Sequence, residues 1–277
     1  MGSMGMQAIL KLMGVSAAVL LSTSQTWAYS DNSIGVTWSN HYREPNNPED
    51  VTKTIVTGTH FSTDLYGRNL LVASFYQSDD KDPDKSGEEG AQEFYGFYRR
   101  YVSLNSLISE SPFKNSMVRD VNLTLRVDAG RKNNLLKNSP LKGRAGLSVD
   151  LNVPKGFLEV GTEYVYESNN NELTGGRFGF DPTYAIFSSW GYPLGEKHFV
   201  EGFIDFIGAQ GKDGFNSNSK PSTMLEMNYF YDVGKPGGLK VGTGYHYWRN
   251  KYSFDAKSEP SGGGTESLVH VGARYHF

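Results

Sequence analysis

The chain has 277 residues, enough for one large or two ordinary domains. Its formal net charge is −3, which is too near neutral for a nucleic-acid-binding protein. Cysteine is absent, which excludes a disulfide scaffold and any thiol chemistry. The mean hydropathy of −0.49 suggests a soluble protein at first, although glycine, tyrosine and phenylalanine are abundant.

The first 28 residues have the organisation of a secretory signal peptide. Lys11 supplies the positive charge, and Leu12 to Leu21 form a short apolar stretch. Thr26-Trp27-Ala28 provides a small-x-small cleavage site, so we expect cleavage before Tyr29. The apolar stretch is too short to anchor the chain as a membrane-spanning helix.

From there on, residues 29–277 repeat one unit, a run of roughly 10 to 13 residues with alternating apolar and polar side chains. The gaps that follow are alternately short and long. This is the signature of an outer-membrane barrel, and it explains how a membrane protein can have a hydrophilic average. We therefore predict one all-β domain, a 12-stranded antiparallel transmembrane β-barrel of the bacterial outer membrane. The predicted strands are 33–43, 51–63, 68–78, 91–104, 119–131, 141–152, 157–168, 180–192, 198–208, 222–233, 238–250 and 265–277.

The gaps predict the two ends of the barrel. An even number of strands puts both termini on the side of the short turns, which is periplasmic in such barrels. Glycine or proline supplies turn geometry in the short gaps, such as 64–67, 153–156 and 234–237. The periplasmic connection 105–118 is long, and we expect a short helix in it. Long outer loops are predicted at 79–90, 132–140, 169–179, 209–221 and 251–264.

The last predicted strand gives the clearest assignment of faces. Its apolar and aromatic residues occupy every second position and end at Tyr275 and Phe277, where an aromatic girdle belongs. His270 and Arg274 alternate with them. Because a basic side chain at mid-depth in lipid costs about 2–4 kcal/mol, we assign the mid-strand charges to the lumen.

A chain that ends in aromatic-x-Phe also carries the signal that the outer-membrane assembly machinery reads. We therefore expect this machinery to be a partner through Phe277. Outer-membrane lipid and lipopolysaccharide are the other expected partners, and no nucleic acid is expected.

The same rule predicts a mixed lining of the lumen, although it leaves the faces of 51–63 and 68–78 undecided. About eight strands leave an interior that side chains fill, whereas 16 to 18 enclose an open channel, so twelve predict a narrow pore. The charges in it can neutralise one another in a purely structural network, or they can bind solute together with aromatic rings. Rings beside hydrogen-bonding groups suit a solute with a flat ring and several hydroxyls. The candidate binding residues are Tyr95, Arg99, Arg126, Arg144, Glu201, Phe203, Asp205, Phe230, His246, Trp248, His270 and Arg274.

Signals for enzymatic chemistry are weak. His60 and Ser62 have the spacing that puts both side chains on one face of a strand, but the tripeptide is common and its sequence context lacks asparagine and is not glycine-rich. We therefore interpret this pair as structural. The acidic stretch 79–84 lacks the fixed spacing of a calcium loop, and a solvated outer loop is the favoured interpretation. No enzymatic activity, cofactor or metal is expected.

Five short runs follow one another along nearly the whole mature chain: 90–96 (GAQEFYG), 118–121 (VRDV), 180–183 (FDPT), 211–215 (GKDGF) and 247–251 (YWRNK). As an ordered set they resemble the nucleoside-specific channel-forming porins (Tsx-like), in particular their divergent proteobacterial branch. The resemblance implies a monomeric 12-stranded barrel whose narrow pore passes nucleosides and deoxynucleosides. It also implies binding of bases and sugars by lumen aromatics and ionisable residues, in agreement with the lining predicted above.

The favoured function is thus a passive outer-membrane channel selective for nucleosides. Two alternatives stay open: a narrow channel for another small solute, either an oligosaccharide or a hydrophobic compound, and a surface enzyme such as an outer-membrane lipase. A channel for acidic sugars should have a mostly basic lumen, and a carrier of hydrophobic compounds an apolar one. The predicted lining is neither.

Overall fold

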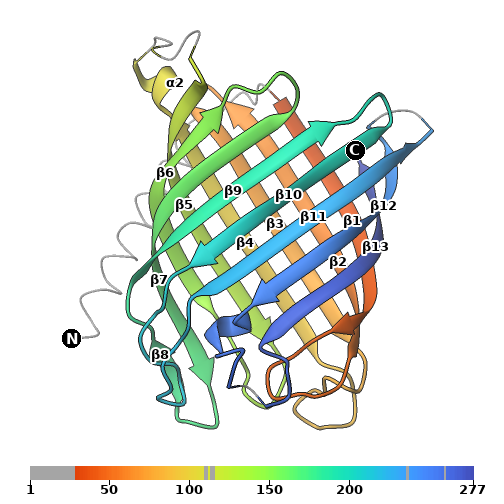
Figure 1. The fold of residues 1–277 in the computed structure, drawn as a ribbon, viewed down its shortest axis with the longest axis vertical. Coiled ribbons are helices and arrows are strands. Elements are labelled where there is room, and N and C mark those ends of the chain that lie inside the picture. Colours follow the sequence, from red (N-terminus) through yellow and green to blue (C-terminus); the bar gives the residue numbers. More distant parts are fainter. Residues whose placement is uncertain (1–28, 109–111, 113–115, 235–236, 259) are drawn as a thin grey trace.

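The computed structural model describes residues 29–277 except 109–111, 113–115, 235–236 and 259. The predicted signal peptide lies outside the described residues. Within them the chain is almost entirely β-structure (Figure 1). No helix in this part of the chain is long and apolar enough to cross a membrane. The strands are β1 (Tyr29–Tyr42), β2 (Val51–Asp64), β3 (Gly67–Ser78), β4 (Gln92–Ser103), β5 (Val118–Lys132), β6 (Leu141–Leu151), β7 (Phe157–Asn171), β8 (Gly176–Gly179), β9 (Thr183–Pro193), β10 (His198–Ile207), β11 (Ser222–Val233), β12 (Leu239–Arg249) and β13 (Thr265–His276).

Apart from β8, each strand pairs antiparallel with the next strand in the wall, and β1 pairs with β13, which closes the sheet into a barrel. The short β8 pairs with the end of β7, and β9 pairs with the rest of β7. These two strands therefore occupy one place in the wall, interrupted at 180–182, where Pro182 has no N–H to donate to a ladder. In the described residues the barrel thus has twelve strand positions, as predicted.

The predicted loop 169–179 is wrong. Strand β7 continues to Asn171, and β8 lies inside the same range, so the connection shrinks to 172–175. The three consecutive asparagines have low strand propensity, yet pairing between the two arms of the hairpin overrides it. The expected helix in 105–118 is confirmed by α2 (Leu104–Ile108).

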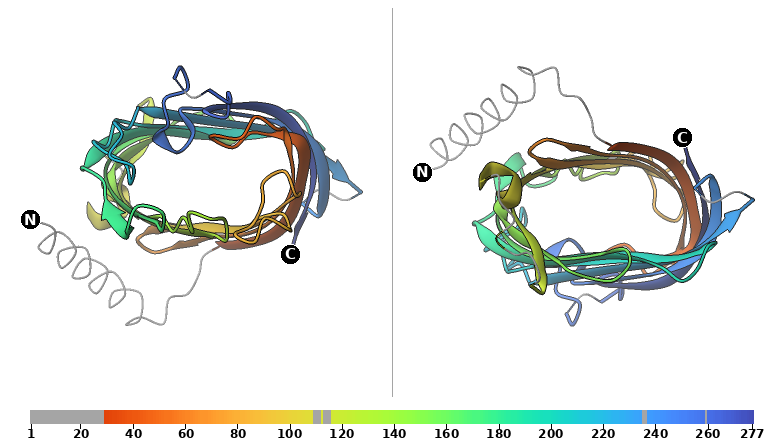
Figure 2. Two further views of the ribbon diagram at one scale, coloured as in Figure 1. Left: turned by 90° about the horizontal axis from the view of Figure 1, so that it is seen from below. Right: turned by 90° about the horizontal axis from the view of Figure 1, so that it is seen from above.

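The two ends of the barrel differ in their connections. Helix α2, the short turns and the C-terminus lie at the upper end in Figure 1, and the long loops lie at the lower end. We call these the turn end and the loop end. Views along the barrel show that its cross-section is flattened (Figure 2).

The alternation of faces in the last strand is confirmed. Val269 and Val271 are 61% and 52% exposed, whereas His270 between them is buried. The outer wall therefore carries apolar side chains, and the buried side chains inside are largely polar or charged, including Asp128 and Glu163. An all-round exposed apolar wall is typical of a protein whose outside does not face water.

The two strands with undecided faces are also settled. In β2 and β3 the exposed apolar residues Val56, Leu71 and Phe75 mark the outer face. Lys53 points inward, where it contacts Glu44. His60 and Ser62 share the parity of Val56 and lie on the outer face.

Candidate functional site

One side of the lumen is filled by buried ion pairs. Arg144 Nη1 lies 2.9 Å from Asp205 Oδ2 and 3.7 Å from Glu163 Oε2. Arg99 Nη2 lies 2.9 Å from Glu163 Oε2. The Arg144–Asp205 and Arg99–Glu163 pairs each join strands that are three places apart in the wall. Side chains on strands so far apart in the wall can meet only across the barrel interior. We call this set the packed cluster; its members are Arg99, Arg126, Asp128, Arg144, Glu163 and Asp205.

Three positive and three negative side chains make the packed cluster neutral. Its guanidinium groups also contact aromatic faces: Arg126 lies 3.9 Å from the ring centre of Phe97. The hydroxyl of Tyr95 donates to Asp128 at 2.6 Å. Each of these buried charges has a partner of opposite sign, which offsets part of the cost of removing it from water.

A second neutral cluster lies at the loop end. Glu44, in the loop between β1 and β2, accepts from Lys53 at 2.5 Å and lies 3.2 Å from both Lys132 and Lys251. Burial by itself would raise the pKa of Glu44, but the three ammonium groups hold that pKa well below its ordinary value of 4.5. We call this set the loop-end cluster; its members are Glu44, Lys53, Asp82, Lys132, Lys251 and Glu266.

The prediction that the acidic stretch 79–84 is solvated is wrong for Asp82, although Asp80, Lys81 and Pro83 are exposed. Asp82 is buried, and its carboxylate lies 2.8 Å from Lys132 Nζ and 3.4 Å from Lys53 Nζ. A buried carboxylate needs such cations because it has lost its water. The loop therefore folds back against the mouth of the barrel.

The opposite side of the lumen is less tightly packed. Arg274 Nη1 donates to Glu201 Oε1 at 2.7 Å, yet their side chains remain 28% and 25% exposed. The Arg274 guanidinium lies 4.6 Å from the ring centre of Phe230. The carboxylate of Glu226 bridges two imidazoles. We call this set the accessible group after its partly exposed Glu201–Arg274 pair, although Phe230 and His270 are themselves buried. Its members are Glu201, Glu226, Phe230, His246, His270 and Arg274.

Two glycines of β12 make room for the rings of the accessible group. A Cβ added at Gly244 would lie 2.4 Å from the imidazole of His270, and one at Gly242 would lie 2.8 Å from the Phe230 ring. No side chain fits at these distances. The glycines are thus part of the site, and alternation alone did not identify them.

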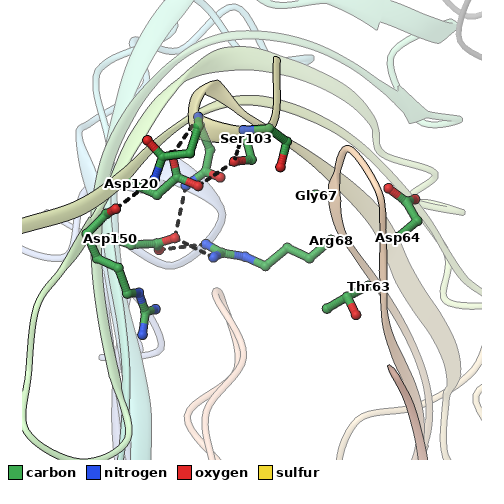
Figure 3. Close-up of a pocket in the computed structure, with 11 residues that line it drawn as sticks. Thr63, Asp64, Gly67, Arg68, Ser103, Asp120 and Asp150 are labelled. Atoms are coloured by element: carbon green, nitrogen blue, oxygen red, sulfur yellow. Dashed lines mark hydrogen bonds and ion pairs between the residues drawn. The ribbon is translucent and has the colours of Figure 1, made fainter. Parts of the chain in front are cut away.

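At the turn end a polar cavity of about 330 Å³ opens beside Arg68 (Figure 3). Arg68 extends across it and donates to both oxygens of Asp150, at 2.6 and 2.8 Å. It also lies 3.2 Å from Glu159, and its guanidinium lies 4.1 Å from the ring centre of Tyr101. Arg68 was missed because the face of its strand was undecided. Only its pairing opposite the buried Tyr101 places it on the lumen face, and no pattern within its own strand shows this.

All twelve candidate binding residues lie on strands with their side chains on the lumen face, but they do not form one site. The packed cluster contains Arg99, Arg126, Arg144 and Asp205, and Tyr95 contacts it through its hydrogen bond to Asp128. The accessible group contains Glu201, Phe230, His246, His270 and Arg274. Trp248 lies toward the loop end, where its Nε1 donates to Ser222 at 2.7 Å, and Phe203 lies between the two sides, paired with Ser189 and Glu226.

No protein-family profile and no curated protein matches the chain. Among solved structures, the β domain of the Bordetella autotransporter BrkA is similar with 12% identity and a TM-score of 0.41, over 90% of this chain and 99% of that one. A bacterial polysaccharide outer membrane secretin gives 12% and 0.39, over 90% and 97%. The Acinetobacter baumannii outer membrane protein Omp33 gives 10% and 0.36, over 90% and 98%. Similarity at this level assigns neither a family nor a solute.

Proposed function

We propose that the chain is a passive channel of the bacterial outer membrane, selective for nucleosides and deoxynucleosides. An exposed apolar wall around a closed barrel with a charged interior suits a channel that lies in lipid. At the turn end the exposed rings of Tyr275 and Phe277 stack with their centres 6.4 Å apart, as in an aromatic girdle. Nucleosides combine the flat ring and the hydroxyls that the lumen chemistry favours.

The accessible group is the observation that carries this proposal. Its ion pair between Glu201 and Arg274 is partly exposed, so its groups are able to exchange partners with a solute. The Arg274 guanidinium lies on the face of the neighbouring Phe230 ring, which is only 7% exposed, so a base stacks on that face when Arg274 moves aside. Carboxylate and guanidinium groups form strong hydrogen bonds with sugar hydroxyls and base edges.

The test is solute block in planar bilayers. Purified protein should give small conductance steps that adenosine or thymidine reduces at concentrations where glucose has little effect. Arg274→Gln should weaken the block by nucleosides because it removes one hydrogen-bonding partner. Lys142→Gln is the matched control: it removes a lumen charge on the other side, paired with Glu167 at 3.3 Å, and should keep the block.

Two results would contradict the proposal. Equal block by glucose and nucleosides removes the selectivity. If Arg274→Gln left the block unchanged and Lys142→Gln abolished it, solute would bind on the side of Lys142 and not at the accessible group.

Assembly into the outer membrane is a separate part of the proposal. Phe277 is 72% exposed and its N–H donates to the carbonyl of Asn32 at 2.9 Å. Its ring is thus not needed to fill the barrel interior, and we propose that the assembly machinery recognises it. Phe277→Ala should lower the amount of folded protein in outer-membrane fractions, measured by heat-modifiable gel mobility, while leaving the conductance of the assembled protein unchanged.

A further inference from the structure

A hydrogen-bonded serine, histidine and asparagine lie together on the outer face of the barrel wall. His60 Nε2 lies 3.1 Å from Ser62 Oγ, and His60 Nδ1 lies 2.8 Å from Asn32 Oδ1. The asparagine comes from β1, directly opposite His60 in the β1–β2 ladder. We call these three residues the outer-wall triad. The asparagine is not close to His60 in the sequence, because the neighbouring strand supplies it.

The order of hydrogen bonds suits a general base. The amide oxygen of Asn32 can only accept, so the proton of the neutral imidazole sits on Nδ1. Nε2 is then an acceptor that faces the Ser62 hydroxyl. A base oriented by a third group and in contact with a hydroxyl is the arrangement that activates serine nucleophiles.

A fourth residue supplies a hydrogen-bond donor beside the serine. Asn69 Oδ1 accepts from Tyr98 Oη at 2.7 Å and from Arg100 Nη1 at 3.1 Å, which turns its amide nitrogen toward Ser62 Oγ at 3.5 Å. The nearby carboxylate of Asp64 is held by both Nη atoms of Arg100. Asn69 Nδ2 also lies 3.4 Å from Asp64 Oδ2, so the amide is held between Asp64 and Ser62 and contributes to fixing the Ser62 hydroxyl in place.

The depth of the outer-wall triad points to its substrate. Asn32 is hydrogen-bonded through its backbone to Phe277, whose ring stacks on that of Tyr275 at the turn end. Aromatic girdles lie at the membrane–water interface, where the glycerol esters of phospholipids also lie. The outer face at this level therefore meets lipid esters rather than water-soluble solutes.

We propose that the outer-wall triad hydrolyses acyl esters of membrane phospholipids. Ser62 Oγ attacks the ester carbonyl carbon while His60 Nε2 takes the hydroxyl proton. The C–O bond to glycerol breaks, the leaving alkoxide receives that proton, and lysophospholipid departs from an acyl-Ser62. Water then attacks the acyl group, with His60 as the base, which releases fatty acid and restores Ser62. The Ser62 side chain is buried, so the side chains above it must move before a lipid reaches it.

The test uses the full-length folded protein in vesicles of phosphatidylethanolamine and phosphatidylglycerol. Fatty-acid release should depend on the protein, and a fluorophosphonate probe should label Ser62. Ser62→Ala should lower release to the vesicle background, on the order of 1,000-fold or more. Asn32→Ala acts on the orientation of His60 and should lower the rate about 10- to 100-fold with a changed pH profile.

Ser30→Ala is the matched control. Ser30 is paired with Ser62 across the same ladder and shares its face, so its loss should leave release unchanged. Heat-modifiable gel mobility shows that each variant is folded. Equal release by the wild type and Ser62→Ala, or no labelling of the folded wild type by the probe, would overturn the proposal. Nucleoside block is measured on the same proteins and is independent of Ser62, so failure of one proposal does not affect the other.

Discussion

The two sides of the lumen use the same residue types in opposite ways. In the packed cluster the Arg144 and Asp205 side chains are 2% and 8% exposed, whereas Arg274 and Glu201 in the accessible group are each about a quarter exposed. Asp205 and Glu201 lie on one strand, four residues apart and on the same face. This difference in exposure means that a charged side chain in the lumen is not by itself a binding group. Its role depends on whether its partner encloses it.

The largest expected effect separates these two carboxylates. Asp205→Ala leaves Arg144 buried with a deficit of negative charge, and should lower the free energy of unfolding by about 3–5 kcal/mol. Glu201→Ala should cost about 0–1 kcal/mol because its pair is partly solvated. Urea titration in detergent micelles, followed by tryptophan fluorescence, measures both. Equal losses would remove the distinction between the two sides.

The loop-end cluster extends the comparison to a group outside the strands. Because the pKa of Glu44 is held well below 4.5, this residue contributes stability that is present above about pH 4.5 and is lost as the pH falls through its lowered pKa. At neutral pH Glu44→Gln should lower the free energy of unfolding by about 2–3 kcal/mol.

That difference between the wild type and Glu44→Gln should shrink as the pH is lowered from about 6 to about 3, measured by the same titration. Glu49→Gln, in the same loop but exposed, is the control and should show no such convergence. A difference that is constant with pH would mean that the charge of Glu44 is not what stabilises the loop end.

A double substitution tests whether the packed cluster needs the whole Arg144–Asp205 pair. Arg144→Met with Asp205→Leu removes both charges of one pair and replaces them by apolar side chains of similar size. Replacement of a whole buried pair is often close to neutral, so the unfolding free energy should lie within about 1 kcal/mol of the wild type. A double variant as unstable as Asp205→Ala would show that the remaining four charges need this pair.

The smallest effect is expected at the surface. Lys137 and Glu172 lie 2.6 Å apart, with side chains 37% and 46% exposed. Glu172→Gln should change the free energy of unfolding by less than about 1 kcal/mol, and the change should vanish in high salt. A loss as large as that of Asp205→Ala would mean that exposure does not govern the strength of these pairs.

Much of the fold could be predicted because each strand carries its own information. A lipid-facing wall penalises charge, so alternation within one strand, as in β13, determines its face and approximate limits. The lumen placement of Arg144, Glu201 and Arg274 followed from that rule alone. Strand β8 was missed because its asparagine-rich hairpin is held by pairing that no local pattern announces.

The arrangement within the site could not be predicted, because it depends on which residues meet across strands. Arg144 reaches Asp205 over three places in the wall, and Asp82 reaches Lys132 from a loop. Neither contact has a sequence spacing that identifies it. The contact of Asn32 with His60 could not be predicted for the same reason, because Asn32 stands 28 residues before His60 and meets it only through the register of two strands.

The seam between β1 and β13 has a consequence for how the barrel forms. In the described strands it consists of six residue pairs, from Ser33 with His276 to Trp38 with Val271, whereas β13 makes eleven pairs with β12 on its other side. Ser39 bonds across it to the carbonyl of Val269, 230 positions away in sequence. Contacts of such high order carry the largest chain-entropy cost and form late in folding. The β1–β13 pairing is therefore expected to form last and to break first. We expect strands to be added to or removed from the wall at this seam.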